Sequence, residues 1–242
     1  MRPTALFHLY SVLAALALPF LARASVNRLR RAGVSIQRAH ERLGHAGMDR
    51  RAGTLIWIYA AGEDEVNSVL PLITEITRAH PNATLLLTSN TAASAQAVTG
   101  QLSGRATHQF SPLEGSGPMD RFLRHWRPDL CVLVNSELWP ILLDRCARAQ
   151  VPVALLDAQL TDASAQGWRR FPVTAAYVLR SIAMAQCRDI ASRNHLRDMG
   201  IEGAQARASG AGLDPFTRDK AGHTLADRLV DLAQNHAADV AG

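Results

Sequence analysis

The sequence is poor in the residues and motifs that mark several common classes of protein. Its 242 residues include only three cysteines, with no CxxC pair, so neither a disulfide framework nor a zinc site is indicated. The nine histidines show no HExxH or other metal-ligand spacing. We therefore expect no metal site, and we interpret the three cysteines as reduced and structural.

Motifs for nucleotide binding and for hydrolysis are also lacking. Neither GxGxxG nor GxxxxGK(S/T) occurs, so a self-contained nucleotide-binding domain of those two types is not expected. No serine lies in a G-x-S-x-G context, which leaves a hydrolase nucleophile unsupported. Hydrophobic residues at 48% and charged residues at 19% are ordinary for a globular protein. The composition indicates one folded domain with appendages and no cofactor of its own.

Positive charge is concentrated in one short segment. Residues 23–51 hold eight arginines against Glu41 and Asp49, whereas residues 52–242 are slightly acidic, although the whole chain carries a net charge of +5. This distribution argues against nucleic acid as a partner. The basic segment directly follows the most apolar stretch, residues 5–22, and arginines beside an apolar helix are typical of a cytoplasmic membrane flank. An anionic membrane surface is the expected partner.

The apolar stretch is interpreted as a membrane anchor. Its 18 positions are near the lower limit for crossing about 30 Å of hydrocarbon, so the helix either spans the membrane or lies half-embedded. A secretory signal peptide is the alternative, because Ala22-Arg23-Ala24 has the form of a cleavage site. The arginines just beyond the apolar run resist export, which favours an uncleaved anchor over residues 1–24 and a cytoplasmic domain. Residues 25–53 then form a basic juxtamembrane segment.

From residue 54 onward, short apolar runs alternate with helical periodicity, as in a parallel sheet with crossover helices. We predict strands at residues 55–60, 84–88, 130–134, 153–156 and, more weakly, 182–186. Helices are predicted at residues 65–79, 92–102, 119–126, 138–149, after 162, and at 189–199. The fold class is α/β, a doubly wound and mostly parallel sheet over residues 54–215, followed by a C-terminal helix or tail over residues 216–242.

Two acidic residues lie where a strand turns into a helix. Glu65 follows the first predicted strand, and Glu137 follows the strongest internal strand. Ligands of open α/β sheets bind at the carboxyl ends of strands, and a carboxylate fixed there is placed to accept the proton of an attacking hydroxyl. Helix capping explains Glu63, Asp64 and Glu65 equally well, because acids at a helix amino terminus are favoured by the helix dipole.

Several short motifs, taken together in their order and spacing, resemble one family. Residues 57–66 resemble W-x-H-A-A-S-V-G-E-V, residues 136–140 resemble T/S-E-L-W-P, and residues 157–164 resemble N-A-R-L-S-x-R-S. Residues 41–44 (E-R-L-G), residues 121–123 (R-F-L) and the run W-x-P-D at residues 126–129 also fit. The chain resembles the amino-terminal, acceptor-side domain of bacterial 3-deoxy-D-manno-octulosonic acid (Kdo) transferases from its first helix to about residue 213.

The resemblance implies a fold, a reaction and a set of site residues. Kdo transferases use two facing Rossmann-like domains of the GT-B type and no metal to transfer Kdo from CMP-Kdo to a lipid A precursor at the bacterial inner membrane. By resemblance, Glu65 is the general base and Glu137 is a second acid of the cleft. The acceptor-binding candidates are Gly62, Asn135, Ser136, Gln159, Arg169 and Arg170.

Departures from the family pattern keep the function open. The family's S-V-G before the base is Gly62-Glu63-Asp64 here, and its two arginines in A-R-L-S-x-R-S are Gln159 and Ala163. Arg169 and Arg170 are placed to compensate, although paired arginines are more often a solvated surface. The sugar-nucleotide half of the family is not found in these 242 residues. A separately encoded carboxyl-terminal domain is therefore the expected partner of an active enzyme.

Three functions follow from these observations. The first is a membrane-bound Kdo transferase of lipopolysaccharide biosynthesis that works with a donor domain. The second is a catalytically inactive paralogue that serves as a lipid-binding or scaffold protein, which the lost arginines favour. The third is a secreted binding protein cleaved after Ala24, which leaves the family motifs unexplained.

Overall fold

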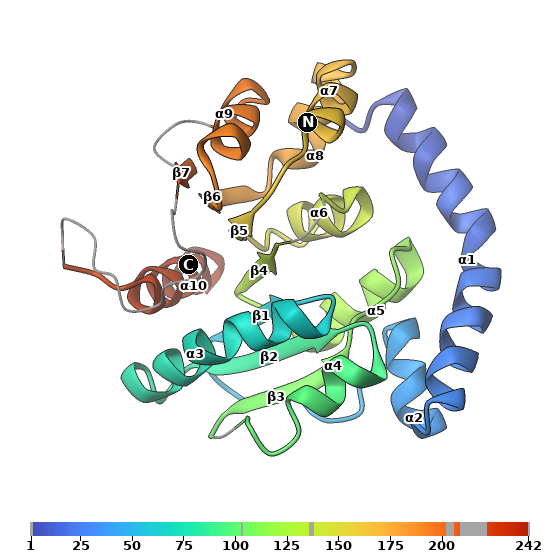
Figure 1. Cartoon of the computed structure of the whole chain (residues 1–242), viewed down its shortest axis with the longest axis vertical. Helices are drawn as coiled ribbons and strands as arrows, with labels where there is room; N and C mark the ends of the chain where they lie inside the picture. Colours follow the sequence, from blue (N-terminus) through green and yellow to red (C-terminus); the bar gives the residue numbers. More distant parts are fainter. Residues whose placement is uncertain (1, 103, 136–137, 202–205, 209–221, 242) are drawn as a thin grey trace.

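The computed structural model describes residues 2–102, 104–135, 138–201, 206–208 and 222–241 of the chain. At its centre is one sheet of seven parallel strands in the order β3-β2-β1-β4-β5-β6-β7 (Figure 1). The strands are β1 (Leu55–Tyr59), β2 (Thr84–Ser89), β3 (Ala106–Phe110), β4 (Leu130–Val134), β5 (Val153–Ala158), β6 (Ile182–Cys187) and β7 (Ala206–Ala208). The predicted α/β fold with a doubly wound parallel sheet is confirmed.

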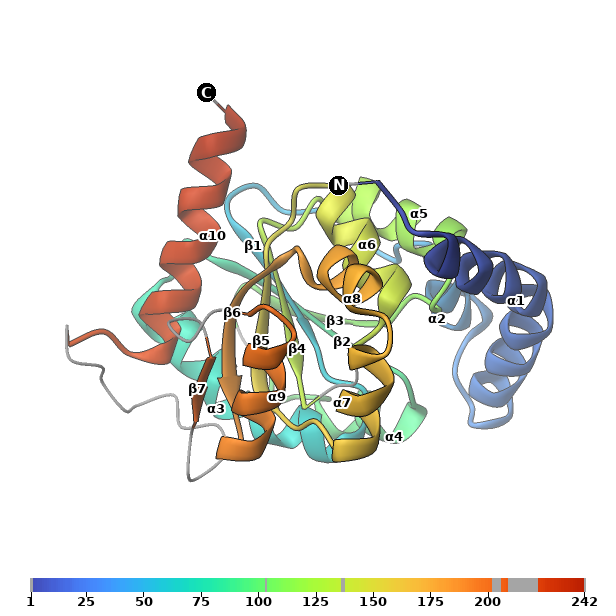
Figure 2. The ribbon, with the colours of Figure 1, turned by 90° about the horizontal axis from the view of Figure 1, so that it is seen from above.

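Helices cover both faces of the sheet and one of its flanks. They are α1 (Ala5–Arg31), α2 (Ile36–Ala39), the 3-10 helix η1 (His40–Leu43), α3 (Glu63–Ala79), α4 (Ala92–Ala97), α5 (Ser116–Trp126), α6 (Pro140–Arg148), α7 (Asp162–Arg169), α8 (Pro172–Leu179), α9 (Ile190–Asp198) and α10 (Leu225–Ala241). Viewed from above, α3 and α10 lie on one side of the strands, and α5, α6 and α8 lie on the other (Figure 2). The sheet is therefore the middle layer of three.

Each face of the sheet has its own apolar core because side chains alternate along a strand. Ile56 and Ile58 of β1 pack toward α3 and α10, whereas Leu55 and Trp57 pack toward α5 and α6. The Trp57 ring lies 4.5 Å from that of Phe122, measured between centroids. All of β1 and β4 is buried, as their continuous apolar sequences predict. Trp57 is therefore a packing residue of the core.

Two strands, the short helices α2 and η1, and helix α8 were not predicted from the sequence. Strand β3 is at the edge of the sheet, carries the polar sequence ATHQF, and buries only its last two residues. Strand β7 has three residues, and α8 begins at Pro172 after an irregular turn. The final helix was expected from residue 216. The structure has α10 from Leu225, and residues 209–221 lie outside the described part of the chain.

Helix α1 is longer than the predicted anchor and continues to Arg31. It is long and apolar enough, by length and composition, to cross a membrane. Figure 1 shows it as an arc along the outside of the domain, from the α7 and α8 corner to α2. The expected N-terminal apolar helix is thus present, and it is packed against the domain rather than separate from it.

Candidate functional site

The order of the strands places a switch point between β1 and β4. Strands β1, β2 and β3 run outward to one side of it, and β4, β5, β6 and β7 run to the other. In open parallel sheets, the crevice at the carboxyl ends of the two strands beside such a point is the usual ligand site. The helix that carries Glu65, α3, follows β1, and Asn135 follows β4, so both predicted positions flank this crevice.

Glu65 is half-buried in the first turn of α3, and its side chain caps the helix. Its Oε2 accepts a hydrogen bond from the backbone N–H of Gly62 at 3.0 Å. A Cβ atom on Gly62 would lie 2.7 Å from that same oxygen, so the lack of a side chain at Gly62 allows the cap. Within the described residues, this Gly62 hydrogen bond engages Oε2 of Glu65 and not Oε1. The capping interpretation and the base interpretation therefore concern different oxygens of one carboxylate.

Three of the predicted site residues follow β4 in the sequence. The structure describes one of them, Asn135. Asn135 has the left-handed backbone conformation, with φ of 41°, and its N–H donates to the Leu156 carbonyl at 2.9 Å. Asparagine tolerates this conformation better than most residues, which gives it a structural role at the turn. Ser136 and Glu137 lie outside the described residues. The second predicted acid of the cleft therefore stays a prediction.

An ion pair that the sequence did not reveal lies at the ends of β5 and β6. Nε of Arg188 donates to both carboxylate oxygens of Asp157 at 3.1 Å, and Nη1 donates to Oε1 of Gln159 at 3.3 Å. Asp157 is buried and has φ of 53°, whereas the Arg188 side chain is 42% exposed. The hydrogen bonds to Asp157 raise the pKa of Arg188, and the charge of Glu65 adds to this shift.

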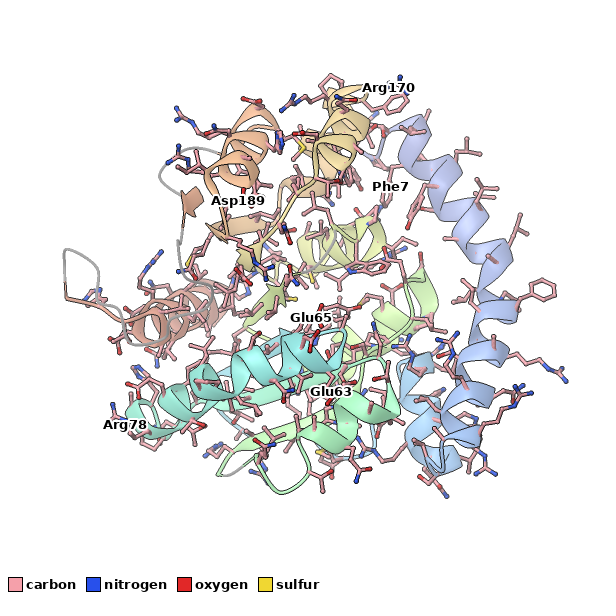
Figure 3. The ribbon with its side chains drawn as sticks, in the orientation of Figure 1. Phe7, Glu63, Glu65, Arg78, Arg170 and Asp189 are labelled. Carbon is pink, nitrogen blue, oxygen red and sulfur yellow. The ribbon has the colours of Figure 1, made fainter. Side chains whose placement is uncertain are left out.

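Arg188 therefore places a guanidinium beside Gln159, where the family pattern has an arginine. Figure 3 shows Glu65 at the start of α3 and Asp189 at the start of α9, on either side of the β4 and β5 strand ends. The available indication of this group in the sequence was that an arginine, Arg188, directly follows a strand. Its neighbours Asp157 and Gln159 come from a different strand, so only the fold brings the three together.

A second group of polar residues lies between the strand ends and α1, around a cavity of about 250 Å³. Arg42 is buried there and donates to Oγ of Ser25 at 3.0 Å, to Oδ1 of Asn90 at 2.7 Å and to the Ser111 carbonyl at 2.5 Å. Burial lowers the pKa of Arg42 to about 10. The neighbouring Glu41 accepts the Phe110 N–H at 2.8 Å. This Glu41-Arg42 motif thus fastens α1 to the ends of β2 and β3.

Glu114 is the acidic member of this cavity. Its two carboxylate oxygens accept the N–H groups of Ile141 at 2.6 Å and Leu142 at 3.2 Å, at the amino terminus of α6. Burial raises the pKa of Glu114 to about 7, although these hydrogen bonds oppose the shift. Burial also raises the pKa of Tyr59, and the charges of Glu114 and Glu65 contribute to that increase.

The two remaining candidates do not join this arrangement. Arg169 donates to Oδ2 of Asp198 at 2.9 Å and contacts Nδ1 of His195 at 2.8 Å, in an exposed pair between α7 and α9. Arg170 ends α7 and is exposed at the corner next to the start of α1, away from Glu65 (Figure 3). The surface interpretation of these arginines fits their positions.

The geometry suits acid–base chemistry on an anionic or polar ligand. A carboxylate stands at the switch point, a guanidinium lies on one side of it, and a mixed polar and apolar cavity lies on the other. Within the described part of the chain, no three histidine, cysteine, aspartate or glutamate side chains are grouped to hold a metal ion.

Comparison with known proteins gives a consistent result. A model of the family described as 3-deoxy-D-manno-octulosonic-acid transferase (kdotransferase) matches residues 37–211, which include every strand of the sheet. The 3-deoxy-D-manno-octulosonic acid transferase of Rickettsia prowazekii is 38% identical over 117 residues, which cover 48% of this chain and 25% of that protein. The corresponding transferase of Rickettsia bellii is 34% identical over 167 residues, which cover 68% of this chain and 39% of that protein.

The chain thus spans between a quarter and two fifths of the length of these relatives. Among solved structures, the UDP-GlcNAc 2-epimerase of Neisseria meningitidis bound to UDP-GlcNAc aligns with a TM-score of 0.48 and 11% identity. The alignment covers 65% of this chain and 46% of that one.

Proposed function

This chain belongs to the 3-deoxy-D-manno-octulosonic acid transferase family, and from that premise we propose that it is the acceptor-side half of a lipopolysaccharide-synthesising enzyme. In this proposal it binds a lipid A precursor and, together with a donor-binding domain, transfers Kdo from CMP-Kdo. The family match over residues 37–211 is the observation that carries the proposal. In this proposal the donor-binding domain docks across the crevice at the strand ends.

Glu65 has the central role in the proposed reaction. Its carboxylate removes the proton from an acceptor hydroxyl while the hydroxyl oxygen bonds to the anomeric carbon of Kdo. The bond from that carbon to the CMP phosphate oxygen breaks, and CMP leaves with the bonding electrons. Oε2 stays on the Gly62 N–H, and Oε1 takes the proton.

The residues around Glu65 hold the substrate in this proposal. Asn135, which follows β4 on the far side of the switch point, contacts the acceptor sugar, and the same role is proposed for Ser136 and Glu137, which lie outside the described residues. Gln159 and the neighbouring Arg188 provide polar contacts at the ends of β5 and β6. Because guanidinium groups bind carboxylates and phosphates in a fixed geometry, Arg188 is the group most suited to an anionic substituent.

Attachment to the cytoplasmic face of the bacterial inner membrane is part of the proposal. The acceptor is a membrane lipid, and α1 is apolar enough to enter a bilayer. The arginines that follow its apolar part favour an anionic, cytoplasmic surface.

One feature favours a second candidate, an inactive paralogue that binds lipid or serves as a scaffold. Two positions that are arginine in the family pattern are Gln159 and Ala163 here. Arg169 is engaged by Asp198 and His195 of α9, and Arg170 lies at the corner beside α1 (Figure 3). Such a protein would keep the acceptor-binding fold without turnover.

A transfer assay separates these candidates. Membranes that contain the chain, with and without candidate donor domains, are supplied with CMP-Kdo and a lipid A precursor, and product formation is measured. We expect Glu65→Gln to lower the rate by roughly 10²–10⁴-fold, the usual contribution of a general base. Glu63→Gln, an exposed acid two residues away, is the matched control and should keep the rate. Full turnover in the Glu65 variant rejects the base, and no transfer in any combination favours the paralogue.

A further inference from the structure

The side chains of α1 are arranged in the reverse of an ordinary amphipathic helix. Between its buried ends, Phe7 and Leu29, the positions that face the domain include the small residues Ser11, Ala14 and Ala22. The large apolar residues point outward: Leu9 is 57% exposed, Leu13 57%, Leu16 67% and Phe20 79%. A helix on the surface of a water-soluble domain has its large apolar residues on the inner face. The outer face of α1 is therefore suited to hydrocarbon.

The inner face of α1 contacts the domain along almost its whole length. At one end, Oγ1 of Thr4 lies 2.8 Å from Oγ1 of Thr174, and the Phe7 ring is 5.2 Å from the Tyr177 ring. In the middle, Leu18 packs directly against Gly115. Toward the other end, Ser25 accepts a hydrogen bond from Arg42 at 3.0 Å.

These contacts restrict how α1 can meet a membrane. From Thr4 to Ser25 the helix is about 32 Å long, close to the thickness of a hydrocarbon core. If it crossed the bilayer with the contacts intact, the polar surfaces of the domain beside it would enter hydrocarbon, where unpaired polar groups are very unfavourable. The contacts are compatible with a helix that lies parallel to the surface, with its outer face immersed.

The corner between α7 and α8 extends this apolar surface. Phe171 is 50% exposed and lines a cavity together with Leu6 and Phe7 of α1, and Val173, in the first turn of α8, is 72% exposed. Between the corner and α1 is an apolar cavity of about 280 Å³, lined by residues that include Leu6, Phe7, Trp168 and Phe171.

Basic side chains are placed at both ends of this surface. Arg170 is exposed at the corner, and Arg23, Arg28, Arg30 and Arg31 are exposed on the last turns of α1. Apolar side chains bordered by arginines are the pattern of a helix that lies in the interface of an anionic bilayer. Figure 3 shows the side chains of α1 projecting away from the domain, with Arg170 beside its amino-terminal end.

We propose that α1 and the α7–α8 corner form one membrane-contact face, which binds an anionic bilayer with α1 parallel to its surface. In this arrangement a hydrocarbon chain of a bilayer lipid fills the cavity between them. The proposal concerns membrane binding alone and does not require transferase activity.

The orientation of α1 is tested with single introduced cysteines in the full chain. The native cysteines Cys131, Cys146 and Cys187 are all buried, so a fluorescent thiol probe reports on the introduced position. The protein is bound to vesicles of phosphatidylcholine with about 30% phosphatidylglycerol, and the depth of probes at Leu9→Cys, Leu16→Cys and Phe20→Cys is measured by quenching with spin-labelled lipids. We expect all three probes at one shallow depth, about 5–10 Å below the headgroups.

A second labelling experiment distinguishes an in-plane helix from a spanning one. Arg2→Cys and Asn27→Cys lie at opposite ends of α1 and are both exposed. A membrane-impermeant thiol reagent added outside the vesicles should label both variants. Labelling of only one of them, or a probe at Leu16 far deeper than those at Leu9 and Phe20, would show that α1 spans the bilayer and overturn the proposal.

The contribution of the corner is tested by a matched pair of substitutions. Val173→Asp is expected to weaken vesicle binding about tenfold, because it puts an acid into apolar and anionic surroundings. Ile190→Asp is the control, because Ile190 is also exposed, at 60%, but lies on α9. Equal binding by both variants would remove the corner from the face. Brominated lipids should quench tryptophan fluorescence less in Trp168→Phe than in the unaltered chain, and unchanged quenching would contradict lipid entry into the cavity.

Discussion

Replacing Glu114 by glutamine is expected to stabilise the protein at alkaline pH and not at acidic pH. Glu114 is buried beside the cavity under α1, and its pKa is raised from 4.5 to about 7, chiefly by burial. A carboxyl group whose pKa is raised in the folded state makes its stabilising contribution below the unfolded pKa. That contribution is lost as the pH rises through the folded pKa. The relevant window is therefore pH 4.5–7.

The size of the effect follows from the difference between the two pKa values. A difference of about 2.5 units corresponds to about 3 kcal/mol in the free energy of unfolding once the group is fully ionised. At pH 5 the loss is only about 1 kcal/mol, because this pH lies only about half a unit above the unfolded pKa and most of the window up to the folded pKa has not yet been crossed. Glutamine keeps one acceptor for the N–H groups of Ile141 and Leu142 and loses the other, which costs about 1 kcal/mol at every pH.

Urea denaturation of the chain and of Glu114→Gln at pH 5 and pH 8 measures this difference. The stability of the variant relative to the unaltered chain should rise by about 2.5 kcal/mol between the two pH values. Groups that are the same in both proteins cancel in this comparison. An equal difference in stability at pH 5 and pH 8 would show that Glu114 is ionised alike in the folded and unfolded states, and would refute the reasoning.

Two further predictions concern the scaffold of the site. Gly44→Ala should destabilise the protein by about 3 kcal/mol or more, because Gly44 has φ of 83° and a Cβ atom there would lie 2.0 Å from the Pro118 carbonyl oxygen. Gly33→Ala, with φ of 82° and open space around it, should cost only about 1 kcal/mol in the same thermal unfolding measurement, and similar losses would contradict the steric argument. Asp144→Asn should cost about 3–5 kcal/mol, because fully buried Asp144 pairs with Arg148 and Arg180 and accepts the Tyr177 hydroxyl. Asp120→Asn removes an exposed pair with Arg145 and should cost less than about 1 kcal/mol in urea denaturation, so comparable losses would refute the importance of burial.

The sequence alone predicts those strands that can be recognised from the residue pattern of a single segment. Strands β1 and β4 are uninterrupted apolar segments, and that pattern is required of strands buried on both faces. Strand β3 lacks the pattern because it pairs on one side only and leaves three of its five residues partly exposed. An edge strand of that kind resembles a loop in sequence.

Features that depend on tertiary contacts were not predictable in the same way. The Asp157 and Arg188 pair joins two strands, and nothing near either residue in the sequence indicates the other. Residues 25–53 were expected to be a juxtamembrane segment. The structure shows that Glu41 and Arg42 in this segment bind the ends of β2 and β3 and thereby hold α1 against the domain. Arg169 contacts Asp198 and His195 of α9, and these contacts between two helices are likewise not indicated by the sequence around either one.

The most direct test of the proposed acceptor half is the binding of a lipid A precursor by this chain alone, without a donor domain. Titration of the purified chain in detergent micelles with the precursor, followed by tryptophan fluorescence, should show saturable binding that a phospholipid of similar chain length does not reproduce. Arg42→Met should weaken it, because Arg42 fastens α1 to the cavity at the strand ends. Binding that is absent, or equal for precursor and phospholipid, would contradict the assignment of this domain to the acceptor.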